Sequence, residues 1–181
     1  MKTVLASAAL SAIVGAAASA DVTYSFTNQT FAGFNFNLAS AAGTLQCSLT
    51  GASINVTLDA STSWTYADDL CVYVWPNPIA MGGALQCVGF SNLNAGQRYY
   101  WPNGGSAAPG TTSVGTVNFS TPLNFSGSAS DYTVWLGNGY GASGTSGTWT
   151  GSVTLIGVNQ IPAPGALALL GLAGLASRRR R

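Results

Sequence analysis

Short segments in which apolar and polar residues alternate fill the middle of the chain. In the clearest of them Ile54, Val56 and Leu58 alternate with Asn55 and Thr57. A period of two residues is typical of a β-strand that buries one face, because successive side chains of a strand point to opposite sides. We expect further strands over residues 22–27, 34–38, 45–49, 70–75, 85–90, 114–119, 123–125, 132–136 and 148–156.

Turn-forming residues separate these segments. Proline, asparagine and glycine cluster at 76–78, 82–83, 102–105 and 137–147, and these residue types favour turn conformations. Outside the two termini no segment has the period of a helix. The pattern predicts an all-β fold over residues 21–160, a two-sheet antiparallel β-sandwich of the jelly-roll kind. Residues 70–75 are apolar on both faces, which predicts a central strand.

The first 20 residues have the features of a secretory signal peptide. Lys2 supplies a positive charge, residues 4–18 are apolar and small, and residues 18–20 form a small-x-small cleavage site that ends at Ala20. No stop-transfer pattern follows, which favours a signal peptide over a membrane helix. We therefore expect Sec-type export and a mature chain that begins at Asp21.

The segment 161–181 has the composition of a second targeting signal. Pro162, Ala163 and Pro164 precede an apolar run over residues 165–176 and four arginines at 178–181. As a helix the run would be about 18 Å long, against roughly 30 Å of hydrocarbon in a bilayer. We expect a short hydrophobic helix that acts as a transient or anchoring membrane contact. The arginines would stay cytoplasmic, with the rest of the chain on the other side of the membrane.

This Pro-Ala-Pro segment, the apolar run and the arginine cluster resemble the PEP-CTERM sorting signal of exported bacterial proteins. The resemblance implies that an exosortase, a membrane-embedded sorting protease, processes the chain near Pro162, Ala163 and Pro164. Ala163 stands where that family usually has glutamate. The alternative is a plain C-terminal membrane anchor that is kept.

A second resemblance covers the predicted domain. The segments 53–58, 64–74 and 147–155 follow one another in the order seen in the jelly-roll domains of proprotein-convertase P-domains and galactose-binding-like modules. In those domains an aspartate precedes an apolar central strand, and a Gly-x-Trp turn opens the last strand. The resemblance implies a jelly roll rather than a particular activity.

Charge is nearly absent from the predicted domain. Between residues 21 and 160 one arginine, Arg98, stands against five aspartates, which leaves a net charge of −4. Without a basic patch, nucleic-acid binding is not expected. The surface must therefore be solvated mainly by serine, threonine, asparagine and glycine, a composition associated with extracellular matrices.

Few residues are suited to catalysis. The chain has no histidine and no glutamate, so neither a Ser-His-Asp triad nor a His-Glu zinc motif can be built. A glycosidase would need two neighbouring carboxyl groups, and adjacent aspartates on a strand point to opposite faces. We expect solvated loop and strand-entry aspartates. A structural calcium site at Asp68 and Asp69 is the alternative, because calcium prefers oxygen ligands.

The three cysteines, Cys47, Cys71 and Cys87, leave one thiol over if a disulfide forms after export. Three pairings are possible. Cys71 and Cys87 lie on consecutive expected strands, which favours their pairing, although a register slip of one residue would put them on opposite faces. A reactive thiol would need a nearby base or cation, so we expect structural cysteines.

Aromatic residues in or beside expected loops are the last candidates: Trp64, Tyr66, Tyr99, Tyr100, Trp101 and Tyr140. Exposed rings would stack on sugars, whereas buried rings would close the ends of the sandwich. The sequence as a whole predicts a non-catalytic, exported cell-surface or extracellular-matrix protein with no cofactor. A polysaccharide-binding module is the alternative, followed by a secreted hydrolase.

Overall fold

The computed structural model describes residues 21–87 and 93–162. These residues form nine β-strands and two short 3-10 turns, with no α-helix among them. The strands are β1 (Val22–Ala32), β2 (Phe36–Ser40), β3 (Leu45–Thr62), β4 (Leu70–Val74), β5 (Leu85–Cys87), β6 (Gln97–Tyr99), β7 (Thr112–Ser126), β8 (Val134–Asn138) and β9 (Ser146–Gln160). The turns are η1 (Ala67–Asp69) and η2 (Gly127–Ala129).

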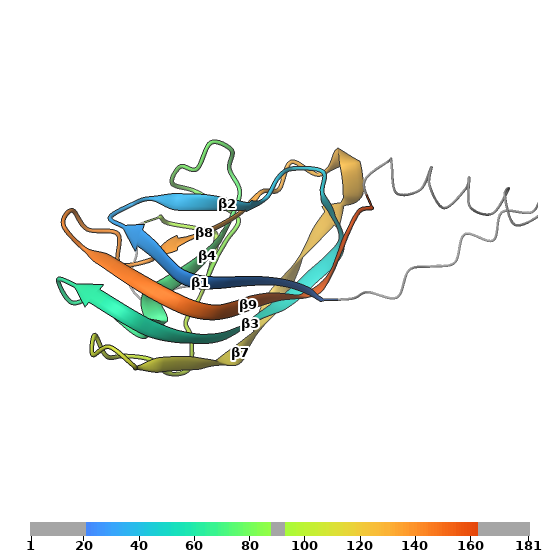
Figure 1. Cartoon of the computed structure of the whole chain (residues 1–181). Helices are drawn as coiled ribbons and strands as arrows, with labels where there is room; N and C mark the ends of the chain where they lie inside the picture. Colours follow the sequence, from blue (N-terminus) through green and yellow to red (C-terminus); the bar gives the residue numbers. More distant parts are fainter. Residues whose placement is uncertain (1–20, 88–92, 163–181) are drawn as a thin grey trace, which may run out of the picture.

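The first sheet contains the long strands in the order β1-β9-β3-β7. All its neighbours are antiparallel, and the four strands lie side by side in Figure 1. Strands β3 and β9 are central and share the most extensive pairing. The sheet is therefore built on this central pair, with one further strand on each side.

The second sheet contains shorter strands in the order β2-β8-β4-β5-β6. Its pairs are antiparallel except for β5 and β6, which run parallel. Strand β4 lies between β8 and β5 and is buried along its whole length, which confirms the central strand expected at 70–75. Together the two sheets confirm the all-β prediction.

The main core is made of inward-facing apolar side chains from both sheets. The apolar positions of segment 54–58 are all buried, as their alternation predicted. Trp149 is the largest of the fully buried side chains. Its ring packs against Phe31 with the centroids 6.1 Å apart, and its Nε1–H donates to the Ala67 carbonyl at 3.1 Å. Trp149 thus connects β9 of the first sheet to the turn that leads into the second.

Several strand boundaries differ from the expectation. Segments 45–49 and 54–58 both belong to β3, and segments 114–119 and 123–125 both belong to β7. The pairing of these two strands shifts register between Leu49 and Gly51, so the interrupted alternation marks a bulge rather than a loop. The short strand β6 was not expected.

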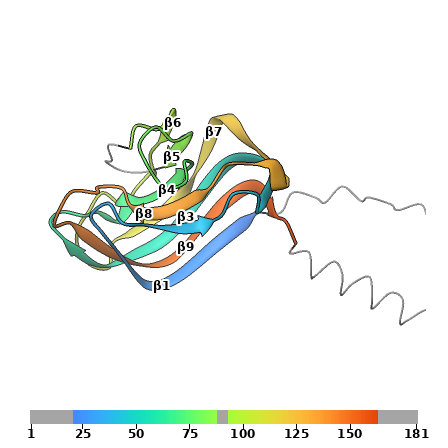
Figure 2. The ribbon, with the colours of Figure 1, turned by 90° about the horizontal axis from the view of Figure 1, so that it is seen from above.

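The two ends of the described chain lie at the same end of the molecule, because Val22 pairs with Leu155 (Figures 1 and 2). The expected signal peptide (1–20) and the apolar run (165–176) lie outside the described residues. Within residues 21–87 and 93–162, no helix is long and apolar enough to cross a membrane.

Candidate functional site

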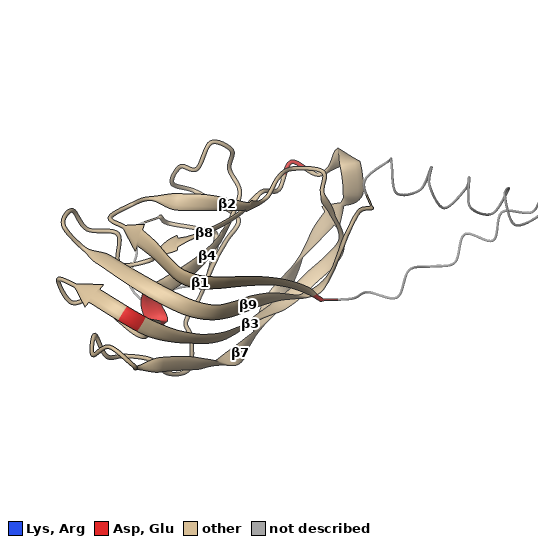
Figure 3. Ribbon diagram, in the orientation of Figure 1, with Lys and Arg blue, Asp and Glu red and all other residues tan. Residues whose placement is uncertain are grey.

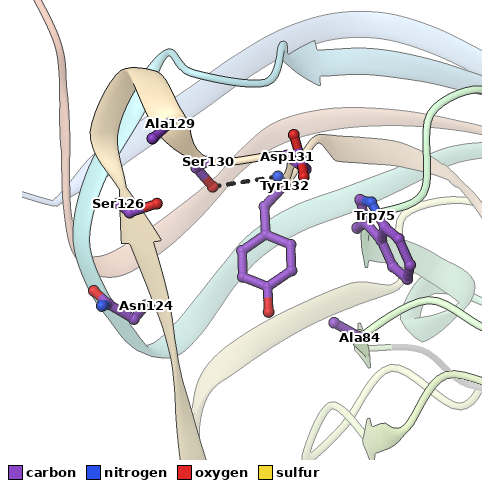
Figure 4. Close-up of a pocket in the computed structure, with 8 residues that line it drawn as sticks. All are labelled: Trp75, Ala84, Asn124, Ser126, Ala129, Ser130, Asp131 and Tyr132. Atoms are coloured by element: carbon purple, nitrogen blue, oxygen red, sulfur yellow. Dashed lines mark hydrogen bonds between the residues drawn. The ribbon is translucent and has the colours of Figure 1, made fainter.

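A pocket lined by aromatic and polar side chains opens where β4 ends, beside the C-terminal half of β7. Its volume is about 440 Å³, within the range typical of small-molecule sites. Three separate parts of the chain supply its lining, which Figure 4 shows: Trp75, Ala84, Asn124, Ser126, Ala129, Ser130, Asp131 and Tyr132.

Trp75 forms one side of this pocket (Figure 4). Its backbone N–H donates to the Thr133 carbonyl at 2.8 Å. The next carbonyl, that of Pro76, accepts a hydrogen bond from Trp135 Nε1 at 3.1 Å. Trp75 has a φ of +52°, a conformation that is strained for a bulky residue and that often occurs at functional sites. Neighbouring contacts therefore hold the residue in place while 39% of it stays exposed.

Tyr132 projects into the pocket from the loop between η2 and β8 (Figure 4). Its ring makes an edge contact with Phe125, with the centroids 5.3 Å apart. Its backbone N–H donates to the Ser130 hydroxyl at 3.2 Å. The ring is thus supported by the core on one side and open to the pocket on the other.

Polar side chains surround the two rings. Asn124 and Ser126 are exposed at the end of β7, and Asp131 is exposed beside Tyr132. Among the described residues of the lining, Asp131 is the only carboxylate. The pocket therefore offers aromatic surfaces with amide, hydroxyl and carboxylate groups, but not the carboxyl pair of most glycosidases.

A second hollow, at the start of β2, has different chemistry. Its volume is about 280 Å³, and apolar side chains line it: Phe34, Phe36, Ile79, Ala80, Met81 and Leu93. These six side chains carry no N–H, O–H or oxygen atom, whereas specific pockets combine apolar walls with placed polar groups. The pocket at Trp75 and Tyr132 is the better candidate site.

The predicted calcium ligands lie in η1, away from this pocket. Asp69 is buried, and its Oδ2 accepts the Tyr66 backbone N–H at 2.7 Å. Burial raises the pKa of Asp68, whose Oδ1 has no hydrogen-bond partner. The described part of the chain contains no cluster of three or more acidic, thiol or imidazole side chains that could hold a metal. The calcium site remains a prediction.

The predicted disulfide between Cys71 and Cys87 is not formed, and the three cysteines are free thiols. Cys87 pairs with Val72 rather than with Cys71. This offset of one residue directs Cys87 into the core between the sheets and Cys71 to the opposite face, beside Tyr73. Burial raises the pKa of both thiols.

The aromatic residues singled out in the sequence do not line the pocket. Trp101 is buried, with its Nε1–H donating to the Leu70 carbonyl at 2.8 Å, and Tyr99 packs on Phe119. Trp64 and Tyr100 are exposed elsewhere. Trp101 and Tyr99 thus have the packing role, and the exposed rings are isolated from the candidate site.

Trp75 and Tyr132 were not predicted as site residues, because the sequence pattern places both in strands. In the structure β4 ends at Val74 and β8 begins at Val134, so each ring lies just outside its strand. The sequence signal for Trp75 is the Pro76-Asn77-Pro78 turn that follows it, since proline ends a central strand. Tyr132 lacks such a signal.

Comparison of the chain with protein-family models, with curated proteins and with solved structures found no match. Of the predicted processing residues, Ala20, Ala163 and Pro164 lie outside the described residues, and Pro162 is exposed after β9. The site therefore has to be interpreted from its own geometry.

Proposed function

We propose that this protein is an exported, non-catalytic component of the cell surface or extracellular matrix whose β-sandwich binds polysaccharide. One observation supports this most: the pocket combines the Trp75 and Tyr132 rings with Asn124, Ser126 and Asp131. A pyranose ring has apolar C–H faces and a rim of hydroxyls. Aromatic rings suit the faces, and amide, hydroxyl and carboxylate groups suit the rim.

Charge favours a neutral glycan over other ligands. The described residues of the pocket include one carboxylate and no cation, so a phosphate or a polyanion has no partner there. The single carboxylate accepts hydrogen bonds from sugar hydroxyls. Without a second carboxyl group beside it, hydrolysis of the bound sugar is not expected.

The strand order supports the jelly-roll form of the sandwich. Consecutive strands β1 to β4 alternate between the first and the second sheet, and so do β7 to β9. Two interleaved runs of this kind are the arrangement of a jelly roll. We infer a jelly roll with β6 added at the edge of the second sheet.

A glycan array tests the proposed binding. The mature exported protein should bind neutral polysaccharides, and Trp75→Ala or Tyr132→Ala should weaken binding by roughly ten- to hundredfold, because truncating a central aromatic contact removes about 1–3 kcal/mol. Trp64→Ala is the matched control, since Trp64 is 75% exposed outside the pocket. Equal loss in all three variants, or binding only to anionic glycans, would contradict the proposal.

Export and sorting belong to the same proposal and rest on the two termini. Residues 1–20 have the features of a signal peptide, and residues 161–181 resemble an exosortase-processed tail. Intact-mass measurement of the exported protein should give Asp21 at the start and an end near Pro164. Recovery of the four arginines on the exported protein would indicate a retained membrane anchor instead.

A further inference from the structure

The outward face of the first sheet carries an ordered array of hydroxyl groups. We call it the hydroxyl face and define it by the cross-strand rows that the registers set. The rows are Thr23–Thr154–Ser53–Thr116, Ser25–Ser152–Asn55–Val114, Thr150–Thr57–Thr112 and Thr30–Thr148–Ala60. Every position in these rows is exposed or partly exposed.

The array repeats along β9 and across the first row, whereas register shifts between Phe26 and Gln29 on β1 and between Leu58 and Ala60 on β3 interrupt it before the last row. Along β9, hydroxyl residues occupy every second position from Thr148 to Thr154, so they recur at about 6.6–6.8 Å on one face of the strand. Across the sheet, neighbouring strands are about 4.7–4.9 Å apart. The first row places a hydroxyl on all four strands. Solubility alone would not require hydroxyls to lie opposite hydroxyls.

Hydrogen bonds between strands fix parts of this array. Thr23 Oγ1 lies 2.8 Å from Thr154 Oγ1, and Thr30 Oγ1 lies 2.7 Å from Thr148 Oγ1. Threonine is also stiff at χ1 because it is β-branched. A ligand would therefore meet side chains that are already ordered, which lowers the entropic cost of binding.

The face has almost no charge and no aromatic ring. Within its rows there is no ionisable group, and the nearest carboxylate, Asp59 on β3, accepts a hydrogen bond from Thr150 Oγ1 at 2.6 Å. Asp59 is the only acidic residue within the described strands β1, β3, β7 and β9, and these strands are mostly tan in Figure 3. Charged and aromatic ligands thus lack their usual partners here.

We propose that the hydroxyl face binds ice. A regular lattice of uncharged donors and acceptors complements an ordered, uncharged array of threonine and serine hydroxyls, each of which can donate and accept a hydrogen bond. Neighbouring strands twist by about 20–25°, which limits the match to a small patch. The expected activity is therefore inhibition of ice recrystallisation rather than a large depression of the freezing point.

The test uses the mature exported protein and measures the growth of ice grains in a frozen sucrose solution. The wild type should slow grain growth relative to serum albumin at equal mass. Ser53→Lys places a charge in the centre of the first row and should abolish the effect. The control is Thr121→Lys, which adds the same charge to an exposed position of β7 outside the rows. It should keep the effect.

Thr154→Val, which removes one hydroxyl and keeps the shape, should reduce the effect even if Ser53→Lys disturbs the fold. Wild-type growth rates equal to those of albumin, or full activity in both Ser53→Lys and Thr154→Val, would overturn the proposal. The proposal would also be overturned if Ser53→Lys left the ice activity unchanged and only stopped the protein from pelleting with insoluble polysaccharide, or only prevented it from forming a dimer. Trp75→Ala should leave ice activity intact, which separates this proposal from glycan binding in the pocket.

Discussion

The two sheets use their outward faces in opposite ways. The outward face of the first sheet is exposed and rich in hydroxyls, whereas that of the second sheet packs Tyr73 and Cys71 against Leu93 and other apolar side chains. Tyr73 also binds the connection between β4 and β5, because its hydroxyl donates to the Ala80 carbonyl at 2.7 Å and accepts from the Gly83 N–H at 2.6 Å.

This difference explains where each kind of site arises. Between their register shifts, the long strands give a repeated surface, because every second residue returns to the same face. Short strands covered by connections give a pocket, because residues just outside the strands, such as Trp75 and Tyr132, are held in irregular backbone. If the two sheets depend on each other, a change in one should affect the other.

The largest effect is expected from Trp149, which lies on β9 of the first sheet and contacts the turn that leads into the second. Trp149→Ala should lower the free energy of unfolding by about 3–5 kcal/mol, since it leaves a large cavity and frees the Ala67 carbonyl. Chemical denaturation followed by circular dichroism measures this. Trp64→Ala should change stability by less than about 0.5 kcal/mol because Trp64 is exposed. A second transition that appears in Trp149→Ala would mean that the sheets unfold separately.

The second prediction concerns how the stability of the protein depends on pH through Cys71 and Cys87, which both lie in the second sheet. Burial raises the pKa of Cys71 and Cys87 above the unfolded value of about 8.5. Folding favours the neutral thiols. Their contribution to the free energy of unfolding is therefore fully present below about pH 8.5 and is lost as the pH rises beyond it. At pH 9.5 the loss is about 1.4 kcal/mol per thiol.

Denaturation at pH 7.5 and 9.5 measures this loss, and the double variant Cys71→Ala/Cys87→Ala should show little of it. In the native protein, Cys47 should be alkylated before the other two, since it is only partly buried. A peptide in which Cys71 is bridged to Cys87 would contradict the register of β4 and β5.

The third prediction links the second sheet to the pocket. A Cβ at Gly83 would overlap the Trp75 carbonyl and the Tyr73 ring, so Gly83→Ala should destabilise the domain by about 1–3 kcal/mol. Because Trp75 must then shift, glycan affinity should fall as well. Gly105→Ala, with open space around its Cβ, is the control for both measurements. Unchanged affinity in a destabilised Gly83→Ala would show that the pocket tolerates movement of Trp75.

The smallest effect is expected in the first sheet. Thr30→Val removes one exposed cross-strand hydrogen bond to Thr148, and such pairs contribute about 0.2–1 kcal/mol. Thermal denaturation of Thr30→Val and of the control variant Thr121→Val measures the difference in stability. A loss above 2 kcal/mol would mean that the hydroxyl pairs stabilise the sheet far more than exposed pairs do elsewhere.

Alternation in the sequence was sufficient to predict most strands and the buried positions of β3, because period two directly reports which side faces the core. It was insufficient where an extra residue shifts the pairing, as between Leu49 and Gly51. The Cys71–Cys87 prediction was wrong for a related reason, since pairing depends on a single-residue register that spacing does not determine. The pocket required the fold, because Asn124 and Trp75 are far apart in the sequence.

The most direct test of the central proposal is an NMR measurement of contacts between the protein and a bound neutral oligosaccharide chosen from the glycan array. Nuclear Overhauser effects should connect the ring protons of Trp75 and Tyr132 to C–H protons of the sugar, and they should disappear for Trp75 in the Trp75→Ala variant. Contacts confined to Trp64 or Tyr100, with none to Trp75 or Tyr132, would contradict the assignment of the pocket as the polysaccharide site.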